Sequence, residues 1–164
     1  MLAESLVKRG IFVFACVFNS DSDGAQNLKS LRSVKVIQMD VTNDNDVKDG
    51  FGIVQKHLSE SKTGYNLTVY FFNAIVLVLW AIVNNAGLCH GGLLEFTPIN
   101  KIRQLIEVNT LGMLGICQTF SPLLRGHGRI VNLTSIAGKL LLLILVLKII
   151  RYNCVPLFWG ILHV

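Results

Sequence analysis

The chain has 164 residues, a length that allows one domain with a sizeable core. Hydrophobic residues make up 52% of it and charged residues only 15%, below the charged fraction of a typical soluble domain. The net charge of +5 suits an anionic partner, but the basic residues are scattered, which argues against nucleic-acid binding. The four cysteines lie far apart without a CxxC pair, so no metal site is predicted.

The first part of the chain alternates helix-like and strand-like segments. Residues 1–9 carry apolar side chains at helical spacing, and Gly10 ends this helix. Residues 11–18 and 34–39 are apolar runs that predict two buried strands. Thr42-Asn43-Asp44 is a helix cap, which predicts a helix over residues 45–60. Its apolar face would consist of Val47, Phe51, Val54 and Leu58.

A further strand is predicted where the run Leu-Trp-Ala-Ile-Val-Asn-Asn-Ala-Gly occupies residues 79–87. In open parallel α/β sheets, ligands bind at the carboxyl ends of strands, so Asn84, Asn85, Ala86 and Gly87 are candidate site residues. The two amides can donate and accept hydrogen bonds, and Gly87 lets backbone or ligand approach closely. An ordinary turn is the alternative for the Asn-Asn pair taken alone.

The last recognisable elements are a long helix and one more strand. Thr97 is predicted to cap the helix, Pro98 to occupy its first position, and the helix to run to about residue 124. Asn109 shares the apolar face of this helix, so it needs hydrogen-bond partners. Residues 129–133 predict the next strand, and Ser135 follows it, where a serine alone is typical of a helix cap.

Taken in this order, these features resemble the short-chain dehydrogenase/reductase family over residues 1–139. The sequence around these motifs is most similar to the branch with retinol, 17β-hydroxysteroid and 3-hydroxybutyrate dehydrogenases. The resemblance implies an α/β fold with a Rossmann-type doubly wound parallel sheet. It also implies hydride transfer between NAD or NADP and a secondary alcohol or ketone of an apolar substrate, of the steroid or retinoid class, and a homo-oligomer in the parent family.

The resemblance also implies a role for each candidate residue. Asp40 and Val41 would contact the adenine, and residues 84–87 would contact the cofactor and the centre of the sheet. Asn109 would support a proton-relay water, the alternative being a core amide bonded to neighbouring backbone. Ser135 would donate a hydrogen bond to the reacting substrate oxygen.

Two motifs of the family are absent from the sequence. There is no Gly-x-x-x-Gly-x-Gly, whose amides would hold the cofactor pyrophosphate, and the strand that precedes it is also missing. In the strand order 3-2-1-4-5-6 that strand lies between the second and the fourth, so the predicted sheet is incomplete. No Tyr-x-x-x-Lys follows Ser135, because Tyr152 is the only later tyrosine and Pro156 stands four residues after it. We therefore expect no dehydrogenase activity from the chain as written.

Two apolar segments depart from the family pattern. Residues 63–78 look inserted into the domain of residues 1–139, and unspliced intron sequence or a membrane-touching hairpin would explain them. Residues 140–164 form an apolar tail, shorter than the roughly 20 apolar residues of a spanning helix. This tail is either a mis-spliced terminus or an anchor to the membrane of the endoplasmic reticulum or the mitochondrion. We expect the chain to be intracellular. The non-enzymatic alternative for its function is a truncated product or a dimerising decoy.

Overall fold

The computed structural model describes residues 2–60, 70–71, 74–75, 79–91, 96–133, 152–153 and 161–163. These residues belong to two compact units, Met1–Val78 and Leu79–Val164. Each unit contains a pair of parallel strands joined by helical connections. The α/β architecture predicted from the sequence is therefore confirmed, and each unit is described by itself below.

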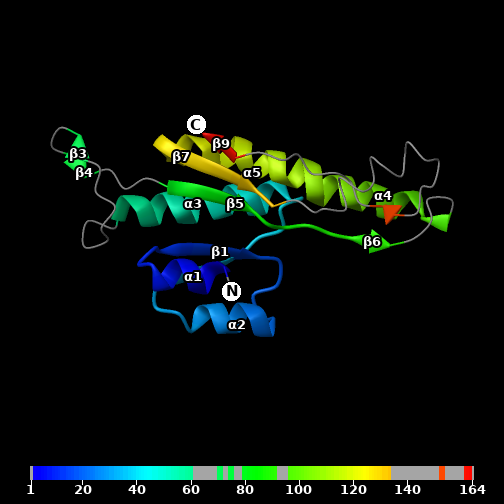
Figure 1. Cartoon of the computed structure of the whole chain (residues 1–164), viewed down its shortest axis with the longest axis horizontal. Coiled ribbons are helices and arrows are strands. Elements are labelled where there is room, and N and C mark those ends of the chain that lie inside the picture. Colours follow the sequence, from blue (N-terminus) through cyan, green and yellow to red (C-terminus); the bar gives the residue numbers. More distant parts are fainter. Residues whose placement is uncertain are drawn as a thin grey trace. The chain divides into compact units, whose positions relative to one another are not determined.

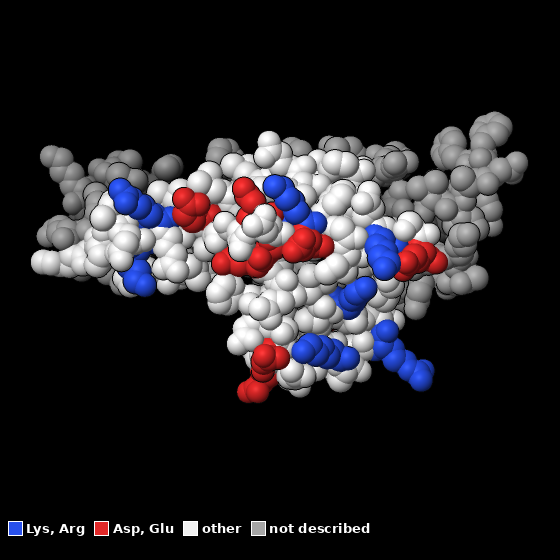
Figure 2. Space-filling model, turned by 180° about the vertical axis from the view of Figure 1, so that it is seen from behind, with Lys and Arg blue, Asp and Glu red and all other residues white. Residues whose placement is uncertain are grey.

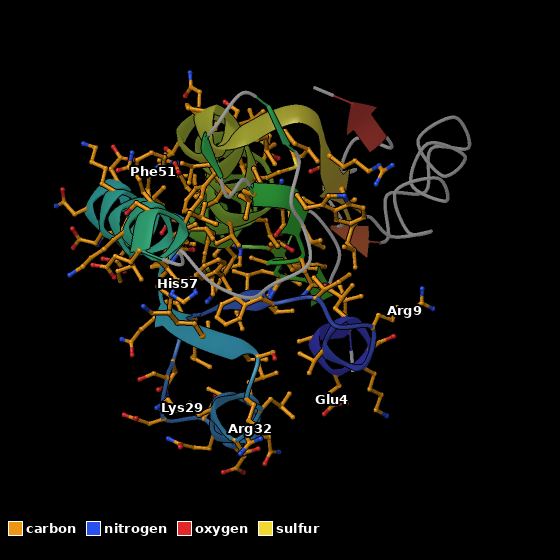
Figure 3. All side chains as sticks on the ribbon, turned by 90° about the vertical axis from the view of Figure 1, so that its left-hand side faces the viewer. Glu4, Arg9, Lys29, Arg32, Phe51 and His57 are labelled. Carbon is orange, nitrogen blue, oxygen red and sulfur yellow. The ribbon has the colours of Figure 1, made fainter. Side chains whose placement is uncertain are left out.

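The first unit is built on two parallel strands. Its elements are α1 (Leu2–Lys8), β1 (Val13–Val17), α2 (Asp23–Lys29), β2 (Val34–Gln38) and α3 (Asp44–Glu60), followed by a hairpin of β3 (Tyr70–Phe71) and β4 (Ala74–Ile75). β1 and β2 pair in register from Val13 opposite Val34 to Val17 opposite Gln38. The helices α1 and α2 lie on one side of these strands and α3 on the other (Figures 1 and 3).

Helix α2 was not predicted from the sequence. Ser22 caps it, because the Ser22 hydroxyl accepts a hydrogen bond from the Ala25 amide at 3.3 Å. Ala25 is the buried residue of the helix. Asp21 is exposed and its amide donates to Asn19 Oδ1 at 2.8 Å, an Asx turn, so the structure places Asp21 in a solvated turn.

Helix α3 covers the other face of the first unit's strands. It begins one residue before the predicted start, and Asn43 Oδ1 accepts from the Asn45 amide at 3.0 Å as its cap. Val47 and Val54 are buried, as predicted. His57 stacks on Phe12 with ring centroids 4.7 Å apart, and its ring meets Phe14 edge-on at 5.3 Å. Figure 3 shows His57 pointing from α3 toward β1.

The second unit contains β5, β7 and one long helix of three segments. Its elements are β5 (Leu79–Asn84), β6 (His90–Gly91), α4 (Ile99–Ile106), the π-helical segment η2 (Glu107–Gly112), α5 (Met113–Phe120), the 3₁₀ turn η3 (Ser121–Leu123), β7 (Leu124–Asn132), β8 (Tyr152–Asn153) and β9 (Ile161–His163). β7 pairs with β5 in parallel and with β9 antiparallel, while β6 pairs with β8. The prediction of one long helix was right in kind, but Pro98 is its N-cap instead of its first helical residue.

Strand β7 begins earlier than predicted. Its pairing with β5 starts with Leu79 opposite Leu124 and jumps to Ala81 opposite Arg129, so extra residues of β7 form an irregularity between the predicted helix and the predicted strand. Gly128 lies there, and an added Cβ would stand 2.7 Å from the Leu124 Cβ. The glycine is therefore required by the close approach of the two residues.

Among the described strands, β1 pairs only with β2, and β5 pairs only with β7. No helix in the described part of the chain combines the length and the apolar character needed to span a membrane. On the face drawn in Figure 2, acidic and basic side chains lie interspersed, without a continuous surface of either sign.

Candidate functional site

The carboxyl ends of β5 and β7 are joined through Asn84. The Asn84 Nδ2 group donates to Asn132 Oδ1 at 2.8 Å and to Cys117 Sγ at 3.2 Å, which links both strands to α5. The Asn84 carbonyl accepts from the Leu133 amide at 2.9 Å, which continues the parallel ladder. Asn84 thus fixes where the chain leaves β5, at the sheet edge where α/β proteins bind ligands.

Asn109 clamps the loop that follows β5. Its Oδ1 accepts from the Leu88 amide at 2.7 Å, and its Nδ2 donates to the Leu88 carbonyl at 2.8 Å. Asn109 is only 5% exposed, the buried polar side chain of the described core. Both ends of the Asn109 side-chain amide are therefore bonded to the backbone of Leu88. This is the arrangement of a core amide bonded to neighbouring backbone.

The two asparagines present an exposed loop, residues 85–88, beside the helix segment η2, in which Asn109 and Gly112 are buried. A short π-helical stretch in an otherwise α-helical element is frequent at functional sites. A Cβ added to Gly87 would lie 3.6 Å from Asn109 Oδ1, which is ordinary van der Waals contact. The protein itself therefore has room for a larger residue, and a need for glycine at this position would have to come from a ligand.

Asp40 belongs to the first unit and lies just after β2. Its Oδ1 accepts from the Thr42 amide at 2.9 Å and from the Thr42 hydroxyl at 2.7 Å, so the carboxylate holds its own turn. The Asp40 amide donates to Asp46 Oδ2 at 3.0 Å. In the described part of the chain, no hydrogen bond to Asp40 Oδ2 or from the Val41 amide is found.

The predicted residues are thus brought together only in part. Asn84, the loop with Asn85, Ala86 and Gly87, and Asn109 lie around the end of β5 in the second unit. Asp40 and Val41 lie in the first unit. Ser135 lies outside the described residues. Asn132 and Cys117 were not predicted as partners of Asn84, and only the β5–β7 register could have identified Asn132.

Each unit, taken by itself, has groups that could bind one part of a dinucleotide cofactor. A carboxylate oxygen and a neighbouring amide can bind the amino group and ring nitrogen of adenine, as at Asp40 and Val41. The exposed loop after β5 offers backbone groups to a nicotinamide ring. The sequence holds no glycine-rich turn for the pyrophosphate. Among the described residues, no group of three or more His, Cys, Asp or Glu side chains could hold a metal ion.

Comparison with known proteins identifies the family and the fold of the chain. The family model for short chain dehydrogenase matches residues 1–144, most of the chain. The chain belongs to the short-chain dehydrogenase family. Its solved relatives include the NADPH-bound carbonyl reductase from chicken fatty liver, with a TM-score of 0.61 and 22% identity over 77% of this chain and 49% of that one. At that identity the likeness establishes the Rossmann-type fold alone.

Proteins similar to this chain in sequence are named for different substrates. The mitochondrial D-beta-hydroxybutyrate dehydrogenase of Rattus norvegicus is 33% identical over 144 residues, which is 85% of this chain and 38% of that protein. Estradiol 17-beta-dehydrogenase 2 of Mus musculus is 34% identical over 143 residues, 84% of this chain and 33% of that protein. The chain therefore spans well under half the length of these relatives.

Proposed function

We propose that this chain forms part of an NAD(P)-dependent oxidoreductase that interconverts a secondary alcohol and a ketone on an apolar substrate of the steroid or retinoid class. We further propose that the chain as given binds nucleotide weakly and does not complete the reaction. The family membership supports the first statement. The absence of a Tyr-x-x-x-Lys after Ser135 supports the second, because hydride transfer to a carbonyl needs a proton donor.

The observation that carries the proposal is the pair of asparagine contacts at the end of β5. Asn84 ties β5 to Asn132, and Asn109 ties the following loop to its helix through Leu88. Together they hold residues 85–88 exposed at the ligand-binding edge of a parallel sheet. Both ends of the Asn109 side-chain amide are bonded to Leu88. A role of Asn109 in proton transfer would therefore use its main-chain groups.

The bound cofactor would supply or accept the hydride, and the residues of this chain would orient it. Asp40 Oδ2 would accept a hydrogen bond from the adenine amino group while Oδ1 remains on Thr42. The Val41 amide would donate to the adenine ring. Ser135 would donate its hydroxyl hydrogen bond to the substrate oxygen, where negative charge develops.

Binding of NADH, NADPH and ADP, followed by fluorescence or calorimetry, tests the proposal. Without a pyrophosphate cradle we expect dissociation constants of about 1 mM, far from the micromolar range of a complete site. Asp40→Asn keeps the acceptor for Thr42 and puts an amide donor where adenine needs an acceptor, so it should weaken binding about tenfold. Asp49→Asn, an exposed carboxylate on α3, is the matched control.

A second variant addresses the other end of the nucleotide. Gly87→Ala meets only ordinary contacts within the protein, so it should leave stability unchanged and weaken NADH but not ADP. Equal binding of NADH by the unmodified chain, Asp40→Asn and Gly87→Ala would contradict the cofactor assignment. Turnover of any alcohol with NAD(P) would contradict the proposed lack of activity.

One observation favours a second candidate function, a dimerising decoy. The long helix of the second unit exposes Ile99, Ile106 and Leu114, with 62%, 41% and 52% of their surfaces accessible. Arg103 and Glu107 lie between them, and opposite charges four residues apart complement each other when two such helices pair antiparallel. Sedimentation of a mixture with a full-length family member, with Leu114→Glu as the variant, tests this alternative.

A further inference from the structure

The charged side chains of the first unit are sorted by the two ends of its strands. Helices α1 and α2 lead directly into β1 and β2, which run parallel, so both helices end beside the amino ends of these strands. Helix α3 ends there as well, because His57 in its last turn stacks on Phe12, just before β1, with ring centroids 4.7 Å apart. We call this end of the first unit the amino edge, and the opposite end, where Asp40 follows β2, the carboxyl edge.

Basic side chains gather at the amino edge. Six of the seven basic residues within residues 2–60 lie there, and all six are exposed: Lys8, Arg9, Lys29, Arg32, Lys35 and Lys56. The one acidic residue among them is Glu60, whose exposed ion pair with Lys56, at 3.8 Å, contributes little to stability. Lys8 and Lys29 complement the dipoles of the helices that they end, whereas Arg32 and Lys35 lie outside any helix and are not explained in this way.

Acidic side chains gather at the carboxyl edge. Seven of the eight acidic residues within residues 2–60 lie there, with Lys48 among them: Glu4, Asp21, Asp23, Asp40, Asp44, Asp46 and Asp49. Both signs are visible in Figure 2, because that view looks across the strands and includes both edges. Figure 3 faces the amino edge and shows Arg9 beside α1 and Lys29 and Arg32 beside α2, spread along the edge instead of converging. Charges spread in this way suit an extended anionic surface better than a single phosphate group.

The chain that continues from α3 at the amino edge is apolar. Residues 63–78 contain no Asp, Glu, Lys or Arg. Their described part is the hairpin of β3 and β4, in which Tyr70 lies opposite Ile75 and Phe71 opposite Ala74. Basic side chains and an apolar segment together hold a protein at an anionic membrane surface more firmly than either does alone, and neither requires a spanning helix.

We propose that the amino edge of the first unit, with the apolar segment that follows α3, binds the surface of an anionic membrane. The six basic side chains would lie against the lipid headgroups, and the apolar segment would enter the interface. The same headgroups would repel the acidic carboxyl edge, so the unit should bind in one orientation. Asp40 would then face the solution, and the inference does not depend on the nucleotide binding proposed above. An acidic polypeptide could match the charges but would leave the apolar segment without a partner.

Sedimentation of the full chain with lipid vesicles tests the proposal. Vesicles of phosphatidylcholine with about 30% phosphatidylserine are the probe, and vesicles of phosphatidylcholine alone are the control. At about 0.1 M salt we expect binding at least about tenfold stronger to the anionic vesicles, and a steep loss as the salt rises to about 0.5 M. Equal binding to both kinds of vesicle, which the apolar residues 140–164 alone would give, would overturn the proposal.

Two pairs of substitutions remove the same charge from different places. Arg32→Gln with Lys35→Gln neutralises two exposed residues of the amino edge that lie outside the helices. Lys48→Gln with Lys101→Gln, the matched control, neutralises exposed residues of the carboxyl edge and of α4. The first pair should weaken binding to the anionic vesicles by about 30-fold and the second by less than about threefold. Equal losses, in variants with unchanged midpoints of urea unfolding, would show that net charge alone acts and would overturn the proposal.

Spin-labelled lipid headgroups locate the bound surface without any substitution. In bicelles of the same lipid composition, they should broaden the NMR signals of Arg9, Arg32 and Lys35 and leave those of Asp23 and Asp44 sharp. Phe71→Asp should remove the binding that remains at about 0.5 M salt, because it places a charge in the hairpin. Broadening at Asp23 and Asp44, or binding of polyglutamate through Arg32 and Lys35 without binding of vesicles, would overturn the proposal.

Discussion

Replacing Asn109 by leucine tests whether its side chain holds the loop after β5. The substitution keeps the branched shape of the side chain, although leucine is larger, and removes two hydrogen bonds to Leu88, of 2.7 and 2.8 Å. Each such bond contributes about 1 kcal/mol net, and a buried group left without a partner costs about 1–3 kcal/mol. Leu88 is 42% exposed, so water can partly replace the lost partners. We therefore expect the second unit to lose about 2 kcal/mol of its free energy of unfolding.

Urea unfolding measures this loss, and amide hydrogen exchange localises it. The Leu88 amide should lose its protection in Asn109→Leu, while amides in β1 and β2 should keep theirs. Gln104→Leu is the control, because Gln104 is an exposed residue of the same helix and should change stability by less than about 0.5 kcal/mol. If Leu88 exchange is the same in both variants, the Asn109 side chain does not hold the loop.

The remaining predictions concern two glycines and two cysteines. Gly128→Ala should destabilise the second unit by about 1–3 kcal/mol, because the new Cβ would stand 2.7 Å from Leu124 Cβ, and a normal midpoint in urea would refute this. Gly115→Ala on α5 meets nothing within 4 Å and should stabilise the unit by about 0.5–1 kcal/mol, which the same titration checks. Cys16 is exposed as a residue, but neighbouring atoms pack around its thiol, and this desolvation raises the pKa of the Cys16 thiol to about 11, so about one thiol in a thousand is ionised at pH 8. Iodoacetamide should therefore label exposed Cys89 first, and labelling of Cys16 should accelerate about tenfold per pH unit up to pH 11; equal rates at pH 8 would contradict the shift.

The sequence predicted those elements whose signal is local and strong. The apolar face of α3 and the cap at Asn43 determined that helix to within one residue. The strands β1, β2 and β5 were found because each is a short apolar run between turn residues. Helix α2 was missed although Ser22 could have identified it, because the Asp and Ser residues around that cap are equally typical of a turn.

The candidate site was harder to predict, because its contacts join residues far apart in the chain. Asn84 was identified by its position after a strand, but its partners Asn132 and Cys117 depend on the β5–β7 register and on the packing of α5. The π-helical segment around Asn109 has no sequence signature that separates it from an α-helix. Of residues 63–78 the structure describes only 70–71 and 74–75, and Ser135 lies outside the described residues, so the insertion and the serine's role stay predictions.

The asparagine contacts also explain how the edge after β5 can keep its shape in a chain whose sequence has no Tyr-x-x-x-Lys motif after Ser135. Asn84 and Asn109 each form a side-chain contact that the fold itself uses, one between strands and one between helix and loop. Aspartate at residue 109 would keep the acceptor for the Leu88 amide but place a charged oxygen against the Leu88 carbonyl, so folding alone favours asparagine there. These residues therefore do not depend on the Tyr-x-x-x-Lys motif for their place in the structure. It follows that the edge at residues 84–88 should form, and should be open to a nucleotide, even where no hydride is transferred.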